Sequence, residues 1–207
     1  MELLPIYSTP VWMSVFPEFD DLKEDFLSCV RNFKKNNPES VEKSNLNGYQ
    51  SPATLQTQKE LAPLFNYICS LCLQASKDLN FVDCDVFLTN AWVNFNDNKN
   101  SINTEHIHEE TFSGVFYLKA PEESGKLVLK NPGINRLWNG CNLTQSKNQF
   151  TGDVIKIEPE EGSLIIFPSY LPHSVEPNNH DDERISISFN VIALPKGVMQ
   201  VQTMTED

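Results

Sequence analysis

The chain has 207 residues, of which 40% are hydrophobic and 21% charged, so it can bury a sizeable core and wholesale disorder is disfavoured. The 16 basic and 28 acidic residues give a formal net charge of −12, which disfavours surfaces that bind nucleic acid or anionic membranes. The start has an acid, Glu2, where a signal peptide has bases, and no stretch approaches the roughly 18 apolar residues of a membrane span. We therefore expect a cytoplasmic protein without nucleic-acid or membrane partners.

The N-terminal part, residues 1–80, contains two segments with helical periodicity. Residues 19–35 carry apolar side chains at helical intervals, and a second helix is predicted over residues 57–79. We expect this part to pack on a β-rich core at residues 81–195, within a single domain over residues 1–207.

The five cysteines are an odd number in a chain too large to need disulfide staples, so free thiols are expected. Cys69 and Cys72 have the spacing of a metal or redox pair. They lie within the helical pattern of the second helix, however, so we expect them to pack in the core.

Short runs typical of β-strands follow one another from residue 85 onward. They cover residues 86–95, 107, 112–118, 126–129, 153–157, 163–167, 173–175 and 185–192. Seven or eight strands separated by turns predict a sandwich or barrel. Two of the turns contain a glycine, Gly125 and Gly162, as expected where the chain reverses with a positive φ.

The large aromatic residues of these runs are expected in the core, because aromatic side chains dominate burial. They are Trp92, Phe112, Phe116, Phe167 and Phe189. Residues 131–153 have the character of a long loop, which we expect to border a binding site and to contribute to substrate choice.

Three of the four histidines fall in two places along the strands. Because residues i and i+2 of a strand project from one face about 6.6 Å apart, His106 and His108 can converge on one ion while Ile107 faces the core. His173 follows the apolar run at residues 164–168, and a second strand could bring it opposite the pair. Imidazole binds zinc, copper, nickel and iron, so the spacing does not choose the metal.

Glu110 leaves the ligand set open, because its side chain would share the face that carries the two histidines. One set is His106, His108 and His173. The other is His108, Glu110 and His173, the arrangement of two histidines and one carboxylate found in non-haem Fe(II) oxygenases.

Arg184 opens an alternating strand, eleven residues after His173. At that position its planar guanidinium could lie inside a barrel and bind a dicarboxylate through two donors. The alternative is a surface arginine paired with one of the acidic residues at 181–183.

An ordered set of motifs runs through most of the chain. It consists of Gly48-Tyr49-Gln50-Ser51, Trp92-Val93-Asn94, His106-Ile107-His108, Ser113-Gly114-Val115-Phe116-Tyr117-Leu118, Phe167-Pro168-Ser169-Tyr170-Leu171-Pro172-His173-Ser174-Val175 and Glu183-Arg184-Ile185-Ser186-Ile187-Ser188-Phe189-Asn190. Taken together, these motifs resemble the Fe(II)/2-oxoglutarate-dependent oxygenase family related to prolyl 4-hydroxylase.

This resemblance implies a mainly β fold with N-terminal helices, whose core is a double-stranded β-helix, the cupin-like jelly roll. It implies that His106, His108 and His173 hold the iron, that Arg184 binds the far carboxylate of 2-oxoglutarate and that Tyr117 assists. The chain has Glu109 where the family has a proline after the second histidine. The three-histidine set is preferred because the H-x-H motif is intact.

On this resemblance we expect a non-haem Fe(II)- and 2-oxoglutarate-dependent oxygenase of the hydroxylase type. It would couple oxidative decarboxylation of 2-oxoglutarate to oxidation of a C–H bond in a small-molecule or peptide substrate. Two other classes stay open: a cupin-type metalloenzyme that does not use 2-oxoglutarate, and a non-catalytic jelly-roll binding module. The identity of the metal and the binding of 2-oxoglutarate distinguish the three.

Overall fold

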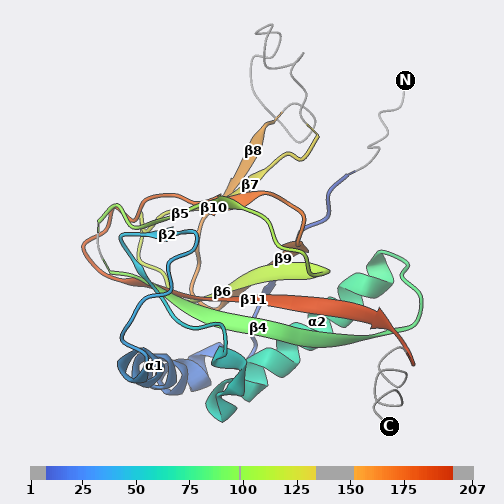
Figure 1. The fold of residues 1–207 in the computed structure, drawn as a ribbon, viewed down its shortest axis with the longest axis horizontal. Coiled ribbons are helices and arrows are strands. Elements are labelled where there is room, and N and C mark those ends of the chain that lie inside the picture. The colour runs from blue at the N-terminus through green and yellow to red at the C-terminus, as the bar shows by residue number, and fades with distance from the viewer. Residues whose placement is uncertain (1–7, 98, 134–151, 198–207) are drawn as a thin grey trace, which may run out of the picture.

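Two antiparallel β-sheets face one another in the computed structural model, which describes residues 8–97, 99–133 and 152–197 (Figure 1). The larger sheet has the order β1 (Trp12–Val15), β9 (Ser163–Pro168), β6 (Phe112–Lys119), β11 (Arg184–Pro195), β4 (Cys84–Asn96) and β3 (Tyr49–Gln50). The smaller sheet has the order β2 (Asn45–Leu46), β5 (Ile102–His106), β10 (His173–Val175), β7 (Leu127–Lys130) and β8 (Val154–Ile157). The predicted mainly β fold, a double-stranded β-helix with N-terminal helices, is confirmed.

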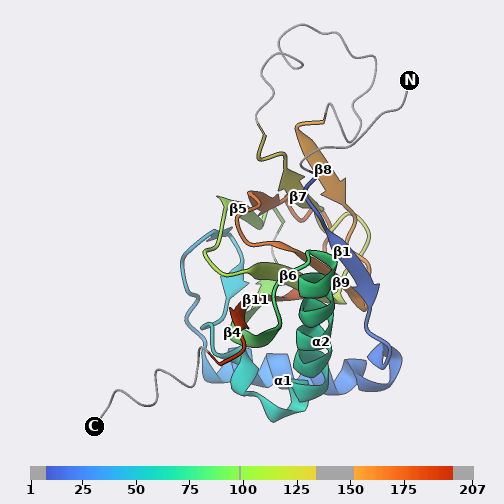
Figure 2. The same ribbon diagram turned by 90° about the vertical axis from the view of Figure 1, so that its right-hand side faces the viewer.

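Two helices cover the face of the larger sheet that points away from the smaller one (Figures 1 and 2). They are α1 (Phe19–Asn36) and α2 (Ala62–Asp78), both close to the predicted bounds. The second helix begins later than expected, because the preceding residues form two 3-10 turns, η1 (Leu55–Thr57) and η2 (Lys59–Leu61). None of the helices in the described part of the chain is long and apolar enough to cross a bilayer.

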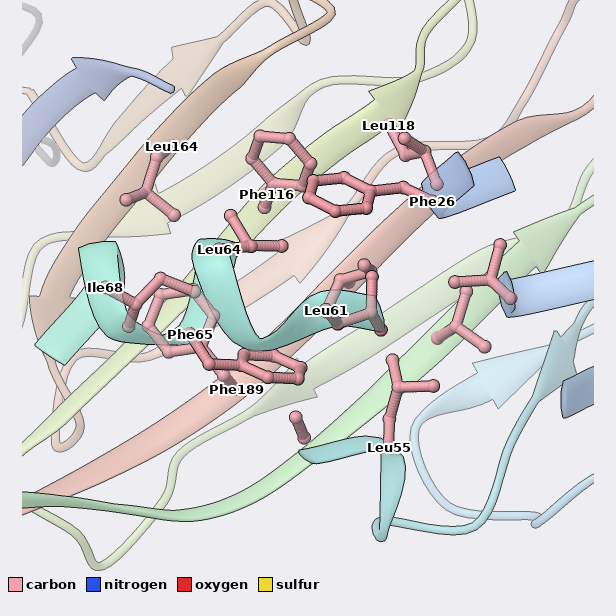
Figure 3. Packing of buried hydrophobic residues seen from close by; sticks show 14 of the residues in the cluster. Phe26, Leu55, Leu61, Leu64, Phe65, Ile68, Phe116, Leu118, Leu164 and Phe189 are labelled. Atoms are coloured by element: carbon pink, nitrogen blue, oxygen red, sulfur yellow. The ribbon is translucent and has the colours of Figure 1, made fainter. Parts of the chain in front are cut away.

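The largest hydrophobic cluster lies between the helices and the larger sheet (Figure 3). Phe26 of α1 and Leu64 of α2 meet Phe116 of β6 and Phe189 of β11 there, and none of these side chains is exposed to solvent. Truncating a core phenylalanine to alanine costs about 3–5 kcal/mol, so this layer fixes the larger sheet as a rigid platform.

The described cysteines are free, as expected. Cys72 lies in the core of α2 and Cys69 is half-buried, which favours packing over a metal or redox role for this pair. Burial raises the pKa of Cys29 to about 11, so that thiol stays protonated at neutral pH. Cys141 lies outside the described residues.

Most predicted strands match observed ones. The exception is the run at Ile107, because β5 ends at His106. Gly125 and Gly162 have φ angles of +91° and +77°, which confirms the two expected glycine turns.

Candidate metal centre

Strand alternation divides the side chains of the larger sheet between two environments. On β4 and β11 the apolar residues point towards the helices, and the alternate residues, which are mostly polar, point into the space between the sheets. The inward residues of these two strands are Asn90, Trp92, Asn94, Asn96, Arg184, Ser186, Ser188 and Asn190. The interior of the β-helix is therefore polar on this side and suited to a ligand.

The three predicted histidines meet in this interior. His106 ends β5 and His173 begins β10, and the two residues are register partners in the antiparallel pair. The ring centroid of His106 lies 4.3 Å from that of His173 and 4.9 Å from that of His108. One ligand nitrogen from each residue can be chosen so that all three lie within 4.8 Å of one another.

His108 reaches the cluster by a different route from the one predicted. It lies beyond the end of β5, where its backbone N–H donates to the carbonyl of Ser169 at 2.9 Å. Ile107 is 56% exposed and does not face the core, so that expectation was wrong. The chain leaves the sheet after His106, and the contact with Ser169 turns His108 back towards the other two rings.

Backbone carbonyls orient two of the imidazole rings. Nδ1 of His106 lies 2.7 Å from the carbonyl oxygen of Thr104, and Nδ1 of His173 lies 2.9 Å from that of Leu171. A carbonyl can only accept, so each Nδ1 carries the proton and each Nε2 keeps its lone pair. Metal-binding histidines are commonly oriented in this way.

Burial keeps two of the histidines neutral. Together with the neighbouring His106, burial lowers the pKa of His173 to about 3 and that of His108 to about 4. Neutral imidazole is the form that binds metal ions, so the donor set fits a transition metal.

Glu110 does not belong to the three-residue cluster. Its Oε1 instead accepts a hydrogen bond from Nδ2 of Asn90 at 3.1 Å. The geometry thus favours the set of three histidines over the set that includes this carboxylate.

Arg184 is buried, with 1% of its surface exposed. Its Nη1 donates to the carbonyls of Ser124 and Gly125 at 2.8 and 2.9 Å, and its Nη2 donates to Oδ1 of Asn96 at 2.8 Å. Its Nε has no hydrogen-bond partner among the described residues. The surface alternative is excluded, because the acidic residues at 181–183 pair with Lys99, Lys119 and Arg31.

Tyr117 is the second buried group without a partner. The residue is 1% exposed, and its hydroxyl forms no hydrogen bond within the part of the chain that the structure describes. Burial raises its pKa to about 12, and the positive charge of Arg184 offsets part of this rise. Tyr117 and Arg184 line one narrow cavity together with His106, His108 and His173. Two unpaired donors thus share a cavity with the histidine cluster.

A second cavity of about 450 Å³ adjoins the first. Trp92, Ser44, His106 and His108 line both cavities. Trp92 is only half-buried, so its predicted place in the core was wrong, while the other four aromatic residues are buried as expected. Its ring lies 5.7 Å from that of His108 and forms a wall of the site.

Several residues that line the two cavities were not predicted from the sequence. Lys43 and Ser44 come from the segment just before β2, and Asn103 comes from β5. In this region of the sequence, only the neighbouring Gly48–Ser51 motif indicated a link to the site, because it belongs to the set of motifs that resembles the oxygenase family. The expectation for residues 131–153 falls largely on residues 134–151, which lie outside the described residues.

Comparisons with known proteins agree with this geometry. Residues 90–190, which include the three histidines, Tyr117 and Arg184, match the model of the family described as "Putative 2OG-Fe(II) oxygenase". No curated protein matches the chain. The family match confirms the predicted relationship to the Fe(II)- and 2-oxoglutarate-dependent oxygenases, which are enzymes.

Solved structures share the fold at low sequence identity. A prolyl-4-hydroxylase from Pseudomonas putida has a TM-score of 0.62 and 16% identity, over 91% of this chain and 94% of that one. HygX from Streptomyces hygroscopicus, with nickel and 2-oxoglutarate bound, has a TM-score of 0.59 and 11% identity, over 92% of this chain and 84% of HygX. A prolyl hydroxylase from Trichoplax adhaerens, in complex with a hypoxia inducible factor peptide fragment, has a TM-score of 0.58 and 16% identity, over 88% and 83%.

Proposed function

We propose that this protein, whose residues 90–190 match the family model of the 2OG-Fe(II) oxygenases, holds Fe(II) with His106, His108 and His173 and binds 2-oxoglutarate with Arg184 and Tyr117. The reaction is hydroxylation of a C–H bond in a small-molecule or peptide substrate. When bound, the iron and 2-oxoglutarate supply the oxidising chemistry, with decarboxylation of 2-oxoglutarate to succinate.

The observation that carries the proposal is the unpaired guanidinium charge beside the histidine cluster. No described carboxylate pairs with Arg184, although a buried charge without a partner is costly. Nε of Arg184 and the hydroxyl of Tyr117 are donors, and a carboxylate accepts from donors. A dicarboxylate in this cavity would satisfy both atoms and balance the charge.

The chain's own residues orient and shield the site. Thr104 and Leu171 hold the rings of His106 and His173 so that both Nε2 atoms stay free for the metal. Trp92 lines both the narrow cavity and the larger one, and a substrate in the larger cavity would lie next to His106 and His108. The substrate and 2-oxoglutarate would thus occupy adjoining cavities.

Calorimetry under anaerobic conditions tests this function. Protein loaded with Mn(II), an inert substitute for Fe(II), should bind 2-oxoglutarate, whereas metal-free protein should bind it far more weakly. With Fe(II) and oxygen, the protein should convert 2-oxoglutarate to succinate. Metal binding without any binding of millimolar 2-oxoglutarate would favour the cupin-type metalloenzyme, and the absence of metal binding would favour the binding module.

We also propose that the protein works in the cytoplasm. The four described cysteines are free thiols, and three of them are buried. Free thiols are typical of a reducing compartment. Fractionation of the cells that produce the protein tests this location.

A further inference from the structure

The cavity of about 450 Å³ beside the histidines has the size of a small-molecule site. It is lined by residues from the segment around β2 and β3, from β4, β5 and β11, and from the connection between β5 and β6. Because His106 and His108 line it, a molecule bound there lies next to the proposed metal.

Apart from the histidines, Lys43 and Glu110 are the charged side chains among the described residues that line this cavity. Neither forms an ion pair with another described residue. The lining therefore carries one positive and one negative charge, and both charges are available to a ligand.

A chain of hydrogen bonds holds Glu110 in place. Asn90 donates to Oε1 of Glu110, and Nδ2 of Asn190 donates to Oδ1 of Asn90 at 2.9 Å. Oδ1 of Asn190 in turn accepts from the hydroxyl of Ser113 at 2.7 Å, and that hydroxyl contacts Ser169 at 2.8 Å. Ser113, Ser169 and Asn190 are buried, so the carboxylate of Glu110 is anchored to the rigid sheet.

Lys43 is held through its backbone, and its ammonium group pairs with none of the carboxylates in the described ranges. Its N–H donates to Oδ1 of Asn45 at 3.1 Å, which fixes the chain at the start of β2.

We propose that this cavity binds a free α-amino acid, with its ammonium group on Glu110 and its carboxylate on Lys43. This inference rests on the proposed function, and it names the substrate class of that site. A zwitterion satisfies both charges and has no net charge, so the −12 charge of the protein does not repel it. A simple anion would be repelled by the carboxylate of Glu110, and a simple cation would be repelled by the ammonium group of Lys43. The neutral polar residues Gln50, Ser51 and Thr104 suit a polar ligand better than a hydrocarbon.

The first test uses the wild-type protein and the 20 standard amino acids. At least one of them should bind to protein loaded with Mn(II) and 2-oxoglutarate, as measured by calorimetry. With Fe(II) and oxygen, the same amino acid should stimulate succinate formation and gain one oxygen atom by mass spectrometry. Its N-acetyl methylamide, which lacks both charges, should do neither.

The second test exchanges the two charged residues for neutral ones of similar size. Glu110→Gln and Lys43→Met should each weaken binding of that amino acid about tenfold or more, the usual effect of losing a hydrogen bond to a charged group. Lys59→Met is the matched control, because Lys59 forms no ion pair with a described residue and does not line the cavity. Its affinity should equal that of the wild type.

The outcomes separate the two proposals. Wild-type protein that converts 2-oxoglutarate to succinate but binds none of the amino acids would overturn the inference and leave the proposed function intact. Binding of the uncharged derivative as tightly as the amino acid would also overturn it. Failure to bind 2-oxoglutarate would overturn the proposed function, whatever the result with amino acids.

Discussion

His106 and His173 stand opposite one another across the β5–β10 pair, with their ring centroids 4.3 Å apart. Each ring is oriented in the same way, through Nδ1 and the carbonyl of the residue two positions earlier. The two strands thus present two Nε2 atoms to the same point, and His108 completes the set from the connection that follows β5. Specific predictions follow from a metal site that is assembled in this way.

Removing one of the clustered histidines should abolish stoichiometric metal binding. We expect His106→Ala and His173→Ala to lose about a hundredfold or more in affinity for Mn(II), because even outer contacts of metal ligands contribute 10- to 100-fold. Calorimetry and metal analysis measure the loss. His180→Ala is the matched control, since the exposed His180 is not part of the cluster and should leave affinity unchanged. Glu110→Gln should also keep the metal; loss of metal in that variant would restore the alternative ligand set.

Tyr117→Phe should lower the affinity for 2-oxoglutarate without lowering the stability of the protein. The hydroxyl has no hydrogen-bond partner in residues 8–97, 99–133 and 152–197, so its removal should leave the free energy of unfolding unchanged or raise it by up to about 1 kcal/mol. Affinity for 2-oxoglutarate should fall about ten- to a hundredfold, as for one lost hydrogen bond to a charged group. Thermal denaturation and calorimetry give the two quantities. A destabilised variant with normal affinity would assign the hydroxyl a structural role.

Arg184→Ala should keep the stabilisation by metal and lose most of that by 2-oxoglutarate. At a hundredfold excess over Kd, a ligand stabilises the folded state by about 2.7 kcal/mol, or very roughly 5 to 10 °C in Tm for a chain of this size. The increments are measured anaerobically with Mn(II), each relative to the same variant without ligand. Arg31→Ala is the control, because Arg31 is an exposed arginine that pairs with Glu183. A normal increment in Arg184→Ala would remove this residue from the site.

Gly125→Ala should weaken 2-oxoglutarate binding from a distance. Gly125 has a positive φ, and an added Cβ would lie 2.2 Å from the carbonyl oxygen of Glu176. Because the carbonyls of Ser124 and Gly125 hold Arg184, displacement of this turn should cost about 1–3 kcal/mol of stability and lower affinity for 2-oxoglutarate. Gly197→Ala is matched in φ but meets no atom within 4 Å. It should be destabilised less and bind 2-oxoglutarate normally.

The metal-free protein should lose stability in weak acid partly through His173. Burial lowers the pKa of this residue to about 3, whereas an unfolded histidine has a pKa of about 6.5. Between these values the unfolded state binds a proton that the folded state does not, so the free energy of unfolding falls as the pH decreases below about 6.5. His173→Asn should therefore lose less stability than the wild type between pH 7 and 5, by up to about 1.4 kcal/mol per pH unit. Urea denaturation in the presence of a chelator measures both slopes, and equal slopes would contradict the prediction.

The sequence alone determined the strands and the division of their side chains. In Ile185–Phe189 every second residue is apolar, and these residues pack on the helices as the period of two requires. Such alternation depends on neighbours along the chain, so it can be read without a structure. The same rule allowed Arg184 to lie inside the β-helix, and its burial in the structure decided against the surface alternative. The spacing of the histidine motifs indicated one shared metal.

Only the tertiary structure decided how the site closes. His108 leaves the strand and is turned by Ser169, Trp92 lines the cavities instead of filling the core, and Glu110 binds Asn90 and stays outside the histidine cluster. The unpaired atoms of Arg184 and Tyr117 were equally beyond the sequence. Each of these features depends on a contact between residues far apart in the chain. The distance between side chains on two different sheets is set by the packing of the whole fold. The local periodicity of the sequence does not encode that packing.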